Sequence, residues 1–156
     1  MSSFHIGWVE PVNGENRPVL THDEVWKGCL LLARSPQSFT TAISSCEIES
    51  DTGNTLTRTL YFSEGPQSKM IQDIILMDKL KFECKSDNGN KVATMIFRGL
   101  SESPEDIYLS IDYSIPYANL DTNGGMTREM YTAKCKQNLV DGLKTMRELK
   151  AQGKLN

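Results

Sequence analysis

Arg58 has the clearest potential for chemistry, and it lies in an alternating stretch, residues 55–63, that we expect to form a strand. Its neighbours at two-residue spacing, Leu56 and Leu60, are apolar, so Arg58 shares their side of that strand. A guanidinium keeps its charge in a protein and has to be paired when it is buried. On an inward face, Arg58 would orient a ligand oxygen and stabilise negative charge that develops on it.

Two partners for Arg58 are open from the sequence. Asp73, on the following strand, could bind the guanidinium in bidentate fashion, and this alternative makes Arg58 and Asp73 the predicted catalytic residues. Glu47, across the turn at residues 51–54, could instead form a surface ion pair, which would be worth little. The facing of further polar candidates depends on strand register, which the sequence does not settle. These candidates are Gln72, Tyr108, Asp112 and Tyr113.

The longest helical pattern in the chain runs from Met126 to Leu149. Its apolar residues recur at steps of three and four, so they fall on one face of a helix. Gly142 lies at the edge of that face, where a glycine costs about 1 kcal/mol relative to alanine. Two explanations for it are open: close packing against a strand, or room for a molecule bound beneath the helix.

The elements before this helix are a strand, two helices and a series of further strands. Residues 4–9 alternate as a half-buried strand does. Thr21 and Glu24 form a capping box at the start of a helix predicted over residues 22–33, and a second short helix is expected over residues 39–43. The period then changes to two, and six strands follow at residues 46–50, 55–63, 69–77, 80–85, 91–98 and 107–113.

This order predicts a single α+β domain over residues 1–156, in which a curved antiparallel sheet of about seven strands wraps around the long C-terminal helix. The short helix pair would follow the first strand. A sheet of this size that curls around a helix commonly encloses a cavity, so we expect ligand-binding residues on its walls. The predicted wall consists of Trp8, Phe62, Phe82, Leu109, Tyr113, Leu139, Gly142 and Leu143.

Composition narrows the class of protein. The net charge of -3 gives no basic footprint for nucleic acid, and no apolar run approaches the length of a membrane span. The N-terminal residues carry no secretory leader, so we expect a cytoplasmic protein. The four cysteines are far apart and lie in apolar or strand-like contexts, which favours reduced thiols. The sequence has no nucleotide-binding or cofactor motif, and its two histidines lack metal-ligand spacing, so neither a cofactor nor a metal is expected.

Four segments carry a resemblance to a known family: residues 58–62, 70–75, 106–113 and 146–155. With the order of the elements, they resemble the helix-grip fold of the START-like superfamily, also called SRPBCC, which includes lipid-transfer domains and bacterial aromatic polyketide cyclases. More narrowly, the chain is similar to the AtaL-like branch, whose functions are largely undefined. The resemblance implies a ligand cavity between the sheet and the last helix, without fixing the ligand.

Three kinds of function are compatible with these features. The first is an enzyme that acts on a polyketide-like or other secondary metabolite as a cyclase, dehydratase or isomerase, without a cofactor. The second is a non-catalytic carrier of a hydrophobic small molecule. The third is an interaction module whose cavity is filled by its own side chains. The oligomeric state stays open, with a homodimer among the states considered.

Overall fold

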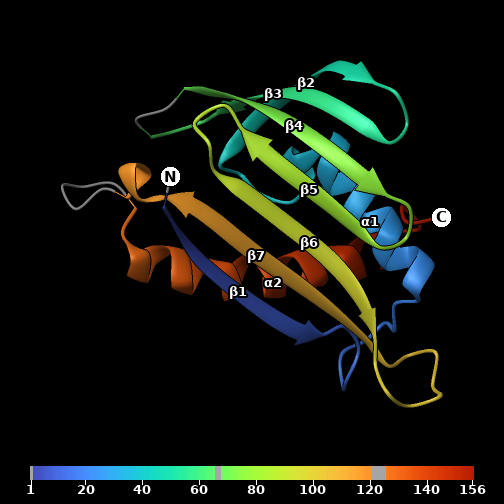
Figure 1. Cartoon of the computed structure of the whole chain (residues 1–156). Coiled ribbons are helices and arrows are strands. Elements are labelled where there is room, and N and C mark those ends of the chain that lie inside the picture. Colours follow the sequence, from blue (N-terminus) through green and yellow to red (C-terminus); the bar gives the residue numbers. More distant parts are fainter. Residues whose placement is uncertain (1, 66–67, 121–125) are drawn as a thin grey trace.

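A computed structural model describes residues 2–65, 68–120 and 126–156 of the chain (Figure 1). Its strands and helices follow the predicted order. They are β1 (Ser3–Pro11), α1 (His22–Arg34), the short 3-10 turn η1 (Pro36–Ser38), β2 (Ile43–Asp51), β3 (Thr55–Phe62), β4 (Lys69–Met77), β5 (Lys81–Ser86), β6 (Lys91–Arg98), β7 (Ile107–Pro116), the 3-10 turn η2 (Tyr117–Asn119) and α2 (Arg128–Ala151).

The strands form one seven-stranded antiparallel sheet in the order β1-β7-β6-β5-β4-β3-β2. From β2 to β7, strands that follow one another in the chain are also neighbours in the sheet, because short connections favour antiparallel pairing. Only β1 pairs out of sequence, with β7, and it thereby forms one edge of the sheet. The α+β prediction and the expected number of strands are confirmed.

Both helices lie on one side of this curved sheet, as Figure 1 shows. The long helix α2 runs lengthwise along β1 and β7, and α1 lies beside its C-terminal half. We call the side of the sheet that bears the helices the helix-facing side, and the opposite side the outer side. No substantial contact joins α2 to β3, β4 or β5 within the described residues, so half of the helix-facing side is left to α1 and to smaller elements.

Local sequence explains where the helices begin and end. The capping box is present as predicted, since the Thr21 hydroxyl accepts from the Glu24 amide and the Glu24 carboxylate accepts from the Thr21 amide. The long helix begins two residues later than expected, at Arg128, with Thr127 as its N-cap. The predicted short helix at residues 39–43 is wrong. The chain forms a single turn at Pro36–Ser38 instead, because proline favours the first position of a turn.

The core lies between the sheet and the two helices. Alternate residues of each central strand face the helices and are buried, as expected for an antiparallel sheet with one solvated side. The largest fully buried side chains of this core are Leu20, Leu56, Ile74, Ile107, Ile115 and Met146. All four cysteines are free thiols. Neither described helix is long and apolar enough to cross a membrane.

Candidate functional site

Arg58 lies on the helix-facing side of β3 with only 6% of its surface exposed. Its Nε donates to Oε1 of Gln72 at 2.9 Å, and its Nη1 donates to the backbone carbonyl oxygens of Leu32 at 2.9 Å and Ala33 at 2.6 Å. These two carbonyl groups belong to the last turn of α1. The C-terminus of a helix carries partial negative charge, so it is a favourable acceptor for a buried cation. Arg58 thereby attaches α1 to the sheet.

Both partners that the sequence suggested for Arg58 are wrong. In the register of β3 and β4, Arg58 is opposite Gln72, whereas Asp73 is opposite Thr57. Asp73 therefore faces the outer side, where its Oδ1 accepts from the Thr57 hydroxyl at 2.9 Å. Glu47 also lies on the outer side. A single-residue offset along a strand reverses the facing of a side chain, which is why neither carboxylate meets Arg58.

The partner of Arg58 continues a row of buried polar groups across three adjacent strands. Gln72 is opposite Ser86 on β5, and its Nε2 donates to the Ser86 hydroxyl at 3.0 Å. We call these three residues, Arg58, Gln72 and Ser86, the Arg58 row. All three are buried. Because each buried polar group in the row has a partner, the row avoids the large cost of an unsatisfied group.

One nitrogen of the guanidinium has no partner of this kind. Among the described residues, no oxygen or nitrogen atom accepts a hydrogen bond from Nη2 of Arg58, although Nε and Nη1 are both used, and the Cys84 thiol is a further, weak partner of the guanidinium. Every fully buried side-chain nitrogen or oxygen of the described residues has a hydrogen-bond partner. Nη2 is therefore not fully buried, and it contacts space that a water molecule can reach. A charged donor in a mostly buried residue is thus available to an incoming acceptor.

Two thiols lie close to the guanidinium, from strands on either side of β3 and β4. Burial raises the pKa of the Cys84 thiol to about 11, and it also raises the pKa of Cys46, while the positive charge of Arg58 opposes both shifts. Burial in turn lowers the pKa of Arg58, although a guanidinium stays protonated in proteins. The thiols therefore remain neutral at neutral pH, which argues against either as a nucleophile.

The surroundings of Gly142 bear on the open space that the sequence predicts beneath α2. A Cβ added at Gly142 would meet no heavy atom within 4 Å. The explanation by close packing against a strand is therefore wrong. At 100° per residue, Gly142 and Asn138 fall on one flank of α2, beside the buried stripe that contains Leu139 and Leu143. This flank, which we call the inner flank, borders space that side chains do not fill at Gly142.

Tyr113 on β7 meets the inner flank of α2. Its hydroxyl oxygen accepts from Nδ2 of Asn138 at 2.7 Å, and its ring lies 6.1 Å from the ring of Tyr131. Burial raises the pKa of Tyr113 to about 12, and the hydrogen bond from Asn138 partly opposes this rise. The phenol therefore keeps its proton over the whole physiological range and acts as a hydrogen-bond donor rather than as a base.

The other predicted wall residues divide into three groups. Phe82, Leu109, Leu139 and Leu143 are buried in the core between sheet and helices. Phe62 lies half-buried at the end of β3, on the same side of the strand as Arg58.

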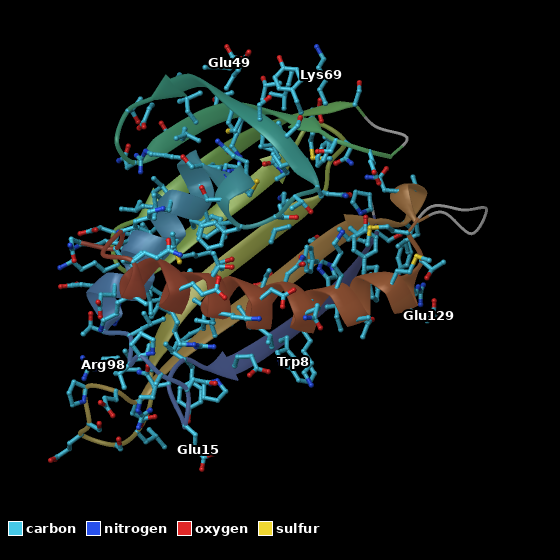
Figure 2. The ribbon with its side chains drawn as sticks, turned by 180° about the vertical axis from the view of Figure 1, so that it is seen from behind. Trp8, Glu15, Glu49, Lys69, Arg98 and Glu129 are labelled. Carbon is cyan, nitrogen blue, oxygen red and sulfur yellow. The ribbon has the colours of Figure 1, made fainter. Side chains whose placement is uncertain are left out.

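Trp8 lies on the edge strand β1, with 40% of its surface exposed. Figure 2 shows it at that edge of the molecule. The Lys136 ammonium lies 5.0 Å from the centre of its ring, and Lys136 is on the flank of α2 opposite Gly142. Trp8 therefore does not border the space at Gly142, and its place in the wall of a ligand site stays a prediction.

Sequence reasoning missed three contributors. Ser86 precedes a hairpin turn, a position that gives no sign of burial, and Asn138 has no feature that separates it from other polar helix residues. The α1 carbonyl groups that bind Arg58 belong to the backbone, so side-chain patterns cannot reveal them. Of the polar candidates, Gln72 and Tyr113 face the helices, whereas Tyr108 and Asp112 are on the outer side with Asp73. No group of three or more potential metal ligands occurs among the described residues.

Comparison with solved structures identifies proteins of the same fold. The aromatase/cyclase ZhuI from Streptomyces sp. R1128 superposes with a TM-score of 0.67 at 14% sequence identity, over 99% of this chain and 96% of that one. The di-domain aromatase/cyclase StfQ of the steffimycin pathway matches with a TM-score of 0.65 at 11% identity, over 97% of this chain and 52% of that one. The di-domain protein BexL of the BE-7585A pathway gives 0.61 at 12% identity, over 94% of this chain and 49% of that one.

Sequence comparison gives the family. No curated protein matches the chain significantly. A family model described as "Acetylaranotin biosynthesis cluster protein L" (AtaL) matches residues 7–153, which is nearly the whole chain. Together with the superpositions, this match confirms the resemblance found in the sequence. The chain belongs to the AtaL family, and its fold is the helix-grip fold of the START-like superfamily.

Proposed function

We propose that the helix-facing side of the sheet binds an apolar small molecule that carries a carbonyl or enol oxygen, and that Arg58 binds this oxygen. The observation that carries the proposal is the Nη2 group of Arg58, which has no oxygen or nitrogen acceptor in the protein beyond the weak thiol contact with Cys84 and is not fully buried. A cation in such surroundings interacts strongly with an acceptor, because little water is present to screen it. The apolar side chains around it would hold the rest of the ligand.

The reaction proposed is a cyclisation, dehydration or isomerisation that passes through an enolate. A carbon–hydrogen bond next to the ligand carbonyl breaks, its proton passes to a base, and the electron pair comes to rest on the oxygen bound by Arg58. The enolate carbon then attacks a second carbonyl carbon, expels a β-hydroxyl group that leaves as water, or regains a proton at a different carbon. Each route conserves electrons without a redox cofactor, and Arg58 would lower the barrier by stabilising the developing charge.

The comparisons support the same class of chemistry at a coarser level. The solved structures that share the fold are named as aromatase/cyclases of biosynthetic pathways, and the family is named after a biosynthesis cluster. Sequence identities below 15% transfer the fold and not the reaction. A secondary metabolite with several oxygens is therefore the substrate class that we propose. Asp73 has no part in this proposal, because it lies on the outer side.

A non-catalytic carrier is the second candidate, and one observation favours it. None of the side chains in the Arg58 row, or in the group formed by Tyr113, Asn138 and Tyr131, is a carboxylate or an imidazole. The proton in the proposed reaction would have to pass to water or to a basic group of the ligand itself. A carrier needs only the binding that Arg58 supplies.

Binding of a simple ketone tests the role of Arg58. Butyrophenone and butylbenzene differ by one carbonyl oxygen, so the ratio of their dissociation constants isolates the oxygen contact. We expect the parent protein to favour the ketone about tenfold, the range for a hydrogen bond to a charged group. Arg58→Met should remove this preference per folded molecule, while Asp73→Asn, a loss of charge on the outer side, should retain it. Equal affinity of the parent for both compounds would contradict the proposal.

Proton exchange separates the enzyme from the carrier. In D2O, an enolate-stabilising site should accelerate deuterium exchange at the carbon next to the carbonyl of bound 1-phenylbutane-1,3-dione, as followed by proton NMR. The acceleration should be absent in Arg58→Met. If the parent binds the dione through Arg58 without accelerating exchange, the protein is a carrier.

A further inference from the structure

The Tyr113 hydroxyl has an unused proton. Its oxygen accepts from Asn138, and among the described residues no acceptor binds its O–H group. A phenol hydroxyl can donate one hydrogen bond as well as accept. Tyr113 is almost fully buried, whereas Asn138 is exposed, so the pair lies where the core meets open space. A donor in that position can bind an acceptor that enters from the open side.

The hydroxyl group of Tyr131, like that of Tyr113, accepts a hydrogen bond from an asparagine side chain. Its hydroxyl oxygen accepts from Nδ2 of Asn90 at 3.4 Å. The orientation of the Asn90 amide is fixed, because its Oδ1 accepts from Nδ2 of Asn119, which also donates to the Asn88 carbonyl. Tyr131 is thus held as an acceptor and keeps its own proton. The centres of the rings of Tyr113 and Tyr131 are 6.1 Å apart, so the two phenol rings are neighbours.

This pair lies well away from Arg58 itself. Tyr113 is on β7 and Arg58 on β3, four strands apart in the sheet. At 4.7–4.9 Å between neighbouring strands, the separation along the sheet is about 19 Å. Gly142 is one helical turn beyond Asn138 on the inner flank, and a Cβ added there would meet no heavy atom within 4 Å.

We propose that Tyr113 and Tyr131 form a second oxygen-binding subsite, with Asn138 as the positioning residue that leaves the Tyr113 proton free for the ligand. The inference rests on the proposed function, because the first subsite is Arg58. The protein then selects elongated molecules that carry two well-separated oxygens over molecules that carry one. Arg58 binds one oxygen as a cation, and the tyrosines bind the other as neutral donors.

A series of diphenyl diketones tests the second subsite. Their two carbonyl groups are separated by methylene chains of increasing length, up to about 19 Å, and each diketone is compared with the monoketone that lacks one carbonyl oxygen. In the parent protein, the second carbonyl should increase affinity about three- to tenfold at one favoured chain length, as a neutral hydrogen bond does. Tyr113→Phe should abolish that gain.

Substitutions at Asn138 distinguish positioning from simple packing. In Asn138→Asp, the new carboxylate accepts the Tyr113 proton, so the gain from the second carbonyl should disappear although the contact between α2 and β7 is kept. In Asn138→Leu, the hydroxyl keeps its proton, and part of the gain should remain. If the hydrogen bond between Asn138 and Tyr113 only held α2 against β7, Asn138→Leu would reduce the affinity gain more than Asn138→Asp.

The two proposals fail in different ways. If the parent prefers butyrophenone over butylbenzene through Arg58, but no diketone binds more tightly than its monoketone, the second subsite is refuted and the proposed function stands. The same conclusion follows if Tyr113→Phe retains the full gain. If butyrophenone shows no preference in the parent, the proposed function itself fails, and a diketone gain lost in Tyr113→Phe would then establish the tyrosine pair alone.

Discussion

Both halves of the helix-facing side are buried, but they differ in the polarity of their buried side chains. Beneath α2, β7 contributes Leu109 and Ile111, which meet the leucines of the helix. On β3, β4 and β5, away from α2, the buried set includes the Arg58 row. Burial of an apolar side chain stabilises the folded state, whereas burial of a guanidinium has a desolvation cost that hydrogen bonds to its partners must offset.

The difference separates buried side chains that serve stability alone from those that also serve binding. Replacing buried charged groups by apolar ones is often neutral or stabilising, so a buried arginine is weak evidence for stability. Arg58 recovers part of its desolvation cost from the α1 carbonyl groups, and its remaining donor has no oxygen or nitrogen acceptor among the described residues. Substitutions of the buried leucines beneath α2 should therefore change stability alone, and substitutions near the Arg58 row should change ligand affinity as well.

The largest effect on stability is expected at Leu143, which is 3% exposed. Leu143→Ala should lower the free energy of unfolding by about 2–5 kcal/mol, because it removes buried methyl groups and leaves a cavity. Urea denaturation measures this change. The affinity of the folded protein for butyrophenone should be unchanged, and a tenfold loss would break the division between the two halves.

The sequence predicted the overall arrangement because it depends on periodicity, which is local. The facing of Arg58 followed correctly from Leu56 and Leu60. Its partner did not follow, because Gln72 and Asp73 differ by one position and only strand register separates them. Register depends on turns and bulges along the whole sheet.

Strand β4 is a case in which the apolar pattern of the sequence overestimates burial. Its sequence has apolar residues on both sides, a pattern that is typical of a strand covered on both faces. In the structure, Ile71 and Ile75 are 42% and 48% exposed on the outer side. An apolar face can be buried, but burial also requires an element that covers it. Among the described residues, no helix or strand covers the outer side of β4.

A smaller loss of stability is expected from Arg58→Met. The substitution leaves the Leu32 and Ala33 carbonyl oxygens and the Gln72 amide without their donor, which should cost about 2–4 kcal/mol in urea denaturation. Arg58→Lys should recover part of this, since an ammonium can still reach a helix C-terminus. Full stability in Arg58→Met would show that the contacts with α1 are incidental.

Substitutions at Gly142 sharpen the comparison, because this residue is next to Leu143. Gly142→Ala should raise the free energy of unfolding by up to about 1 kcal/mol, since alanine favours a helix and the new Cβ meets nothing. Gly142→Leu should instead lower ligand affinity more than it lowers stability, by filling the space beside the inner flank. If Gly142→Leu lowers stability but leaves ligand affinity unchanged, the open space at Gly142 is not part of the ligand-binding site.

The smallest effect concerns alkaline pH. The pKa of Tyr113 is raised to about 12 in the folded protein, from an ordinary value near 10. The unfolded chain releases this proton first, so the contribution is fully present below pH 10 and is lost as the pH rises toward 12. Tyr113→Phe should therefore flatten the fall in stability over this window.

The most direct test of the role of Arg58 is the carbon-13 chemical shift of the carbonyl group in bound, carbonyl-labelled butyrophenone. A hydrogen bond from a guanidinium draws electrons from the carbonyl carbon, so we expect a downfield shift relative to the ketone in an apolar solvent. The shift should persist in Asp73→Asn and disappear in Arg58→Met. A bound carbonyl that resonates as it does in an apolar solvent, or a shift that survives in Arg58→Met, would contradict the binding of a ligand oxygen by Arg58.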